Sequence, residues 1–183
     1  MMRKRIIGAL CALTVCGALS AQGKFIHKNG YKGTVELGYA AGAGDVAHNR
    51  MELLTVHGFQ LNKNFSLGIG TGLQVWQVSD DITIPIFLDA EALLPKGVIS
   101  PFASIRLGYV VNTRDEFFFP KQGVYFNPSV GFRWAIEGNK AFRLNVGYLL
   151  QSSDFIHNAH LPYNQFSERI FFHALSAKVS FEF

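Results

Sequence analysis

Apolar and polar residues alternate along most of this chain, and the alternation continues to the last residue of the closing stretch FFHALSAKVSFEF. Alternate residues of a strand point to opposite faces of its sheet. One face of this stretch would therefore carry Phe171, His173, Leu175, Ala177, Val179, Phe181 and Phe183. No stretch after residue 21 shows a helical period. The pattern predicts eight strands, at roughly 31–40, 50–61, 65–78, 82–94, 99–111, 124–136, 141–150 and 170–183.

The connections between these strands alternate in length. Tight turns are expected at 62–64, 95–98 and 137–140, and longer loops at 41–49, 112–123 and 151–168, with 79–81 as a short exception. In an up-and-down barrel, successive connections lie at opposite ends, so one end would hold the tight turns and both termini. Membrane barrels of bacteria have this layout. We therefore predict an all-β fold, an eight-stranded antiparallel up-and-down transmembrane β-barrel.

The polar face of the strands indicates which side points inward. It carries ten charged residues, five acidic and five basic, together with many glycines: Lys32, Glu36, Glu52, Asp89, Glu91, Arg106, Arg133, Arg143, Lys178 and Glu182. Glycine weakens a strand but suits the tapering interior of a small barrel. The opposite face of 82–94 and of 141–150 carries no charge, which suits lipid, where a mid-bilayer Lys or Arg costs about 2–4 kcal/mol. A soluble lipocalin-like carrier with an apolar interior is the alternative.

The first residues resemble a secretory signal peptide. A basic start, MMRKR, precedes the apolar run IIGALCALTVCGAL, which is too short to cross a bilayer as a helix. We expect residues 1–21 to be the signal peptide and 22–183 to be one barrel domain. Removing Arg3, Lys4 and Arg5 lowers Lys plus Arg from 17 to 14 against 13 acids, so the net charge falls from +4 to +1. The basic charge is therefore no indication of nucleic-acid binding, and the mature chain has no cysteine for disulfide or thiolate chemistry.

The chain resembles the small OmpA/OmpX-type outer-membrane barrel proteins over all of its mature length, in its signal, its eight alternating strands, its turn asymmetry and the closing KVSFEF. The resemblance implies a monomer in the bacterial outer membrane with periplasmic termini, in contact with membrane lipid and lipopolysaccharide. It also implies that Val179, Phe181 and Phe183 form the signal read by the barrel-assembly machinery. Aromatic residues at both rims would mark the membrane interfaces: Tyr31, Phe59, Phe65, Trp134 and Phe181 at one, and Tyr39, Tyr109, Tyr148 and Phe171 at the other.

The sequence indicates the fold more clearly than the function, because proteins with this fold have several different roles. An eight-stranded barrel holds little besides side chains, so we expect the ten inward charges to pair and leave the lumen mostly non-conducting. A structural or cell-surface role follows, with a narrow pore as one alternative. The triplet Phe117 to Phe119 in loop 112–123 is a possible contact surface for a partner.

A lipid-modifying enzyme, similar to outer-membrane deacylases, is a further alternative. His157, His160, Ser153, Ser167 and Glu168 supply the residue types of a nucleophilic triad, but the His-x-Ser spacing of that family is absent. The same two histidines with Asp154 make an incomplete metal-ligand set. We therefore predict no catalytic residues, metal or cofactor.

Two further expectations concern single residues. His57 falls on the lipid-facing side of its strand, and we expect a β-bulge to turn it inward. Four basic residues near the long loops are expected at the outer rim, where they could meet lipid phosphates: Arg50, Arg114, Lys121 and Arg169.

Overall fold

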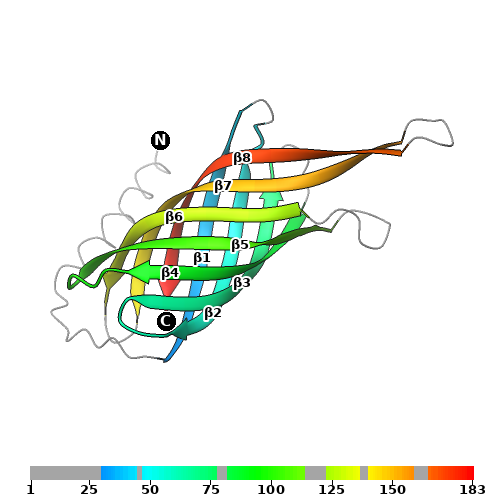
Figure 1. Cartoon of the computed structure of the whole chain (residues 1–183). Helices are drawn as coiled ribbons and strands as arrows, with labels where there is room; N and C mark the ends of the chain where they lie inside the picture. The colour runs from blue at the N-terminus through cyan, green and yellow to red at the C-terminus, as the bar shows by residue number, and fades with distance from the viewer. Residues whose placement is uncertain (1–29, 45–46, 78–81, 114–122, 137–139, 159–164) are drawn as a thin grey trace, which may run out of the picture.

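The computed structural model describes residues 30–44, 47–77, 82–113, 123–136, 140–158 and 165–183. They form a single antiparallel sheet in which each strand pairs with the next and the last pairs with the first, so that the sheet closes into a barrel (Figure 1). The strands are β1 (Gly30–Ala43), β2 (Arg50–Gln60), β3 (Phe65–Trp76), β4 (Ile82–Leu93), β5 (Ile99–Asn112), β6 (Gly123–Ala135), β7 (Ala141–Asn158) and β8 (Gln165–Glu182). The predicted fold class is confirmed.

Closure of the barrel depends on the end of the chain. β8 pairs with β1 from Thr34 opposite Glu182 to Ala43 opposite His173. The pairing extends one residue further, because Gly33 and Phe183 exchange backbone hydrogen bonds of 3.0 and 2.9 Å. The terminal alternation therefore exists because the last strand closes the sheet, which leaves no unpaired edge along the barrel wall.

The two ends of the barrel differ. The turn end holds Gly30, Phe183 and the tight turns, and the loop end lies opposite. In the β2–β3 turn the Asn62 side-chain oxygen accepts hydrogen bonds from the backbone N–H groups of Asn64 and Phe65, at 2.8 and 2.9 Å. In the β4–β5 turn Gly97 has a φ of 115°, a conformation open mainly to glycine. Local turn chemistry thus places both connections where the sequence predicts them.

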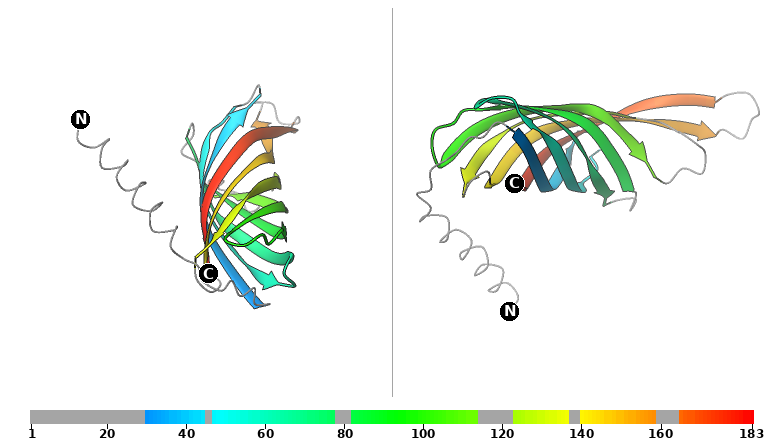
Figure 2. Two further views of the ribbon diagram at one scale, coloured as in Figure 1. Left: turned by 90° about the vertical axis from the view of Figure 1, so that its left-hand side faces the viewer. Right: turned by 90° about the horizontal axis from the view of Figure 1, so that it is seen from below.

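The prediction is wrong about the last connection. Residues 151–168 were expected to form a loop, but β7 runs on to Asn158 and β8 begins at Gln165, and the two strands pair continuously up to these residues. β6 pairs with β7 only as far as Gln151, and β1 pairs with β8 only as far as His173. The distal parts of β7 and β8 therefore form a two-stranded ribbon that projects beyond the loop end (Figures 1 and 2).

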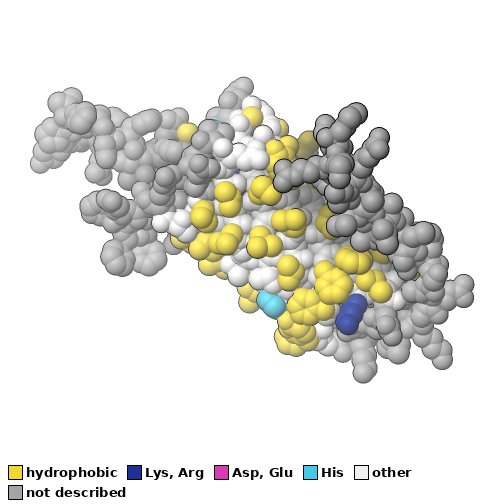
Figure 3. All heavy atoms as spheres, turned by 180° about the vertical axis from the view of Figure 1, so that it is seen from behind, with side chains coloured by type: hydrophobic (Ala, Val, Ile, Leu, Met, Phe, Trp, Pro, Cys, Tyr) yellow, Lys and Arg dark blue, Asp and Glu magenta, His cyan; other side chains and the backbone are white. Residues whose placement is uncertain are grey.

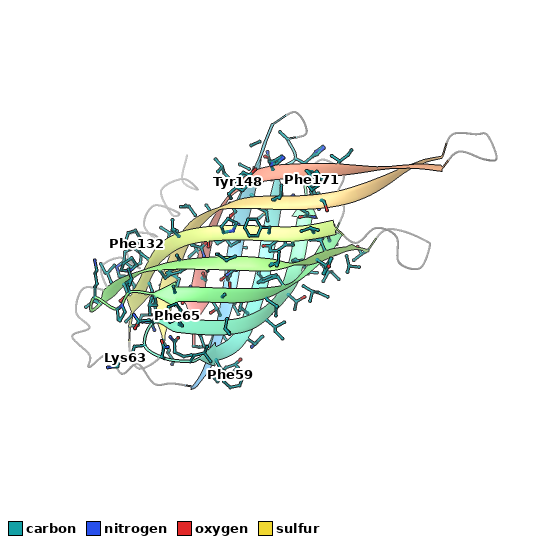
Figure 4. The ribbon with its side chains drawn as sticks, in the orientation of Figure 1. Phe59, Lys63, Phe65, Phe132, Tyr148 and Phe171 are labelled. Carbon is teal, nitrogen blue, oxygen red and sulfur yellow. The ribbon has the colours of Figure 1, made fainter. Side chains whose placement is uncertain are left out.

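The exterior of the barrel is apolar. On the strands whose side chains are described, no Asp, Glu, Lys or Arg faces outward, and the exposed positions are mostly Leu, Ile, Val, Phe and Tyr. Figure 3 shows one such face as predominantly hydrophobic. Phe59 and Phe65 point outward at the turn end, and Tyr148 and Phe171 lie toward the loop end (Figure 4). Among the described residues, no helix is long and apolar enough to cross a membrane.

The expected bulge at His57 is absent. β2 keeps an unbroken register with both neighbours, with His57 opposite Gly33 on β1 and Ile69 on β3. The imidazole is therefore exposed on the apolar exterior, where Nδ1 lies 2.5 Å from the Tyr31 hydroxyl and Nε2 lies 3.0 Å from the Thr55 hydroxyl. These hydroxyls satisfy both ring nitrogens, which removes the need to turn the ring inward.

Candidate functional site

The interior of the barrel gathers the charged residues into a space closed to solvent. All ten charged positions singled out from the sequence point inward. Nine of them are at most 7% exposed, and the Lys32 side chain, at the turn end, is 12% exposed. Strict alternation of side chains explains this, because the exterior positions between them are apolar. A buried charge needs a partner, so the pairing of these groups decides what the lumen can do.

Five of the charges form one cluster near the turn end. Glu91 on β4 accepts a hydrogen bond of 2.5 Å from Lys32 Nζ and forms an ion pair with Arg143 on β7. Glu182 on β8 accepts from Arg133 Nη2 at 2.7 Å, and its other oxygen lies 3.6 Å from both Lys32 Nζ and Arg143 Nη1. The cluster therefore joins side chains from five strands across this end of the lumen.

A second group crosses the middle of the barrel. Arg106 on β5 donates from Nη1 and Nη2 to the two carboxylate oxygens of Glu36 on β1, each at 2.7 Å, and from Nε to Asp89 on β4 at 2.8 Å. A bidentate guanidinium–carboxylate pair is among the strongest hydrogen-bonded arrangements in proteins. Because β1 and β5 lie on opposite walls of an eight-stranded barrel, this pair spans the lumen.

Glycine and aromatic residues fit around these charges. The Phe87 ring lies directly over Gly70 on the neighbouring strand, where a Cβ would overlap it. The same ring stacks on Tyr125, with centroids 5.2 Å apart, and the Arg106 guanidinium lies 5.2 Å from its centroid. Small residues are thus needed opposite large ones, as the taper of a narrow barrel requires.

A third group lies toward the loop end. Lys178 Nζ donates to Asn127 Oδ1 at 2.6 Å and lies 3.5 Å from Glu52 Oε2. Arg50 lies beside Glu52 and is fully buried, so its expected place among the phosphate-binding residues of the rim is wrong. Strand parity was the available signal, because Arg50 lies two residues before the inward Glu52. The signal is weak here, because position 50 is the first residue of the predicted strand 50–61 and lies at the rim.

The other sequence candidates are tested only in part. Arg114, Lys121, His160 and the Phe117–Phe119 triplet lie outside the described residues, as does the signal peptide. The backbones of Ser153, Asp154, His157, Ser167, Glu168 and Arg169 belong to the ribbon, which gives them strand and not loop positions. No group of three or more His, Cys, Asp or Glu that could hold a metal ion occurs in the described part of the chain.

The three residues of the proposed assembly signal lie on one stripe of β8. Val179 and Phe183 are exposed on the exterior, and Phe181 is half-buried between Phe142 and Phe183, with ring centroids 5.4 and 6.5 Å away. The stripe runs along the outside of the closing strand and ends at the turn end. Its recognition by an assembly machinery stays a prediction.

We compared the chain with protein families, curated proteins and solved structures, and only solved structures match it. The sequence matches no protein-family model and no curated protein. Among solved structures, Neisserial surface protein A is similar with a TM-score of 0.56 and 13% identity, over 82% of this chain and 95% of that one. OprG, an outer membrane protein of Pseudomonas aeruginosa, gives a TM-score of 0.58 and 9% identity over 88% and 98%. The outer membrane enzyme PagL gives 0.52 and 13% over 79% and 97%.

The chain therefore has the fold of eight-stranded outer-membrane barrels. Identities this low establish the fold alone, and the finer resemblance to the OmpA/OmpX-type family stays a prediction. The three structures include a surface protein and an enzyme, so the fold leaves the role open. The role must be argued from the closed lumen and the projecting ribbon.

Proposed function

We propose that this protein is an integral barrel of the bacterial outer membrane, with its termini on the periplasmic side, that acts at the cell surface and not as a pore. The observation that carries the proposal is the Arg106–Glu36 pair, which spans the middle of the lumen. The apolar exterior supports the location, because a barrel with this surface would be insoluble outside a membrane.

The lumen is unsuited to conduction. A permeating ion or solute would have to separate Arg106 from both Glu36 and Asp89, and then Arg143 from Glu91. Breaking a buried pair leaves an uncompensated charge at a cost of about 3–5 kcal/mol. Two such layers in series therefore oppose conduction through the lumen.

The ribbon offers a surface for contact outside the membrane. From Ser152 to Asn158, β7 extends seven residues beyond its pairing with β6, which corresponds to roughly 23 Å of strand. A two-stranded ribbon is marginally stable by itself, and each of its strands has one unpaired edge. We infer that it is stabilised by the sugar and phosphate groups of lipopolysaccharide, whose hydroxyl and phosphoryl oxygens can bond to exposed backbone N–H groups.

Conductance tests the first part of the proposal. The purified protein in a planar bilayer should show no steady channel current. Replacing Arg106, Glu36 and Asp89 by alanine together with Arg143 and Glu91, so that both layers are removed, should produce small openings. Lys63→Ala, in an exposed turn, should leave the bilayer silent. Large and steady currents through the unmodified protein would overturn the closed lumen.

Shortening the ribbon tests the second part. Residues 153–169 are replaced by a four-residue Asn-Gly turn segment, and the barrel is checked for a gel mobility that changes on boiling in SDS. We expect a folded barrel that no longer retains purified lipopolysaccharide on a detergent column. Undiminished retention by the shortened barrel would contradict a role for the ribbon.

A further inference from the structure

We propose that the lumen contains a binding site for a small oxyanion, such as a carboxylate, at Arg50 near the loop end. The inference goes beyond the surface role, because it concerns a buried side chain that neither the closed lumen nor the ribbon uses. Three observations carry it: the unpartnered guanidinium, the charge balance of the lumen and the donors around the site.

Arg50 is 0% exposed, and none of its three guanidinium nitrogens has a hydrogen-bond partner. The nearest carboxylate oxygen, Glu52 Oε1, lies 3.9 Å from Nε and already accepts a 2.6 Å hydrogen bond from Gln74. Arg106, in the same barrel, makes three hydrogen bonds of 2.7–2.8 Å through its guanidinium. Arg50 is thus buried without the hydrogen-bond partners that a buried cation requires.

The charge balance of the lumen also indicates that Arg50 lacks a negative partner. The ten charges identified from the sequence comprise five acids and five bases, and Arg50 makes the described interior six basic residues against five acidic ones. Each of the five carboxylates already has a contact with a cation other than Arg50: Glu36 and Asp89 with Arg106, Glu52 with Lys178, Glu91 with Arg143, and Glu182 with Arg133. A single negative charge beside Arg50 would neutralise the interior.

The surroundings of Arg50 are suited to hold that charge. The Trp76 ring lies 4.5 Å from the Arg50 guanidinium carbon, which is within the range of a cation–π contact. The Tyr125 hydroxyl is also buried without a hydrogen-bond partner. Phe172, paired with Gln151 on β7, packs edge-on against Trp76 at 5.2 Å, and His48 lies 5.7 Å from Phe172.

These groups favour an oxyanion over other occupants. The guanidinium offers parallel N–H donors that match the two oxygens of a carboxylate or phosphate, and the Tyr125 hydroxyl can add a third donor. The rings of Trp76, Phe172 and His48 pack against one another, with Trp76 against the guanidinium, so we expect the bound group to be small.

Fluorescence of Trp76 provides a direct test. The chain has two tryptophans, and Trp134 lies exposed at the turn end, so Trp134→Phe leaves Trp76 as the only tryptophan. The variant is purified from membranes in detergent and titrated with formate, acetate, phosphate or chloride, with ionic strength held constant by a bulky sulfonate buffer. We expect a saturable change in emission with formate or acetate.

Three further variants, each made in the Trp134→Phe background, assign the response. Arg50→Gln should abolish it, and Tyr125→Phe should weaken the affinity roughly tenfold, the effect of one hydrogen bond to a charged group. Lys63→Gln removes a cation from an exposed turn at the opposite end and should leave the titration unchanged.

The proposal is overturned if no anion gives a saturable change, or if Arg50→Gln responds like its parent. If Arg50→Gln does not fold, thermal unfolding of the Trp134→Phe protein decides. Formate or acetate at constant ionic strength should raise its Tm in a concentration-dependent way, and an unchanged Tm would reject the site.

Discussion

Arg106 and Glu36 face each other across the barrel and are joined by two parallel hydrogen bonds of 2.7 Å. They lie 70 residues apart in the sequence, on strands that are not neighbours in the sheet. Their separation in sequence means that the pair forms only after the sheet has curved through half of the barrel. The pair therefore contributes to closure as well as to the blocked lumen.

Removing both members of this pair should cost less than the sum of the two single losses. Arg106→Met leaves Glu36 and Asp89 buried without their cation, and we expect a loss of about 3–5 kcal/mol in unfolding free energy. Glu36→Gln keeps the shape of the carboxyl group and removes its charge. The double variant should lose less than the sum of the two, by about 1–3 kcal/mol, as measured by urea unfolding in lipid vesicles. Strictly additive losses would show that the pair is not coupled.

Position 108 should not tolerate even the methyl side chain of alanine in place of Gly108. A Cβ at this position would overlap the carbonyl oxygen of Ile86 on the neighbouring strand, which is backbone and cannot turn away. Gly108→Ala should therefore destabilise the barrel by about 1–3 kcal/mol in the same unfolding experiment. Ser180→Ala is a matched control inside the lumen, because its buried hydroxyl has no hydrogen-bond partner and its loss should cost little. Equal stability of Gly108→Ala and the parent would contradict the close approach.

The sequence predicts the barrel well because its strongest signal is local. Alternation with a period of two assigns each residue to a face, and the contrast between a charged face and a charge-free face then identifies the interior. Glu36, Asp89 and Arg106 could be placed in the lumen in this way. The partner of each charge could not, because pairing across the lumen depends on the stagger of all eight strands.

The incorrect predictions also concern features that the local alternation of residues does not show. His57 looked misplaced because the hydroxyl of Tyr31, 26 residues away, could not be known to reach it. Arg50 lies at the first residue of β2, where an uncertainty of a few residues in the strand boundary decides between rim and lumen. The ribbon was missed because residues 151–168 are mostly polar and their few apolar residues do not alternate regularly, so no apolar face of a strand can be recognised.

The Tyr31 hydroxyl should stabilise the barrel only while His57 is present. Tyr31→Phe leaves His57 Nδ1 without its partner on an apolar surface, and we expect a loss of about 1 kcal/mol. In a His57→Leu background the same substitution should change the unfolding free energy by less than half as much. Urea unfolding of the four proteins in vesicles measures the difference. An equal effect of Tyr31→Phe in both backgrounds would mean that the hydroxyl acts through water or lipid.

Phe183 should matter more for assembly in cells than for stability. Its ring covers Gly33, with a ring carbon 2.5 Å from where a Gly33 Cβ would lie, and its other side is exposed on the barrel exterior. Phe183→Ala should therefore cost only about 1–2 kcal/mol in vesicles, less than the roughly 1.5–3 kcal/mol for full burial of such a side chain. If Val179, Phe181 and Phe183 are read during assembly, the amount of boiling-sensitive barrel in the outer membrane should fall several-fold.

Leu175→Ala separates the two effects of that substitution. Leu175 lies on the same exterior stripe of β8, away from the three residues of the proposed signal, and is 65% exposed. Its truncation removes comparable lipid-facing surface, so the loss of stability in vesicles should be similar. Assembly in cells should stay near that of the parent, because the terminal stripe is intact. If both variants lower assembly in proportion to their stability, Phe183 contributes only as a lipid-facing side chain, and the assembly signal is rejected.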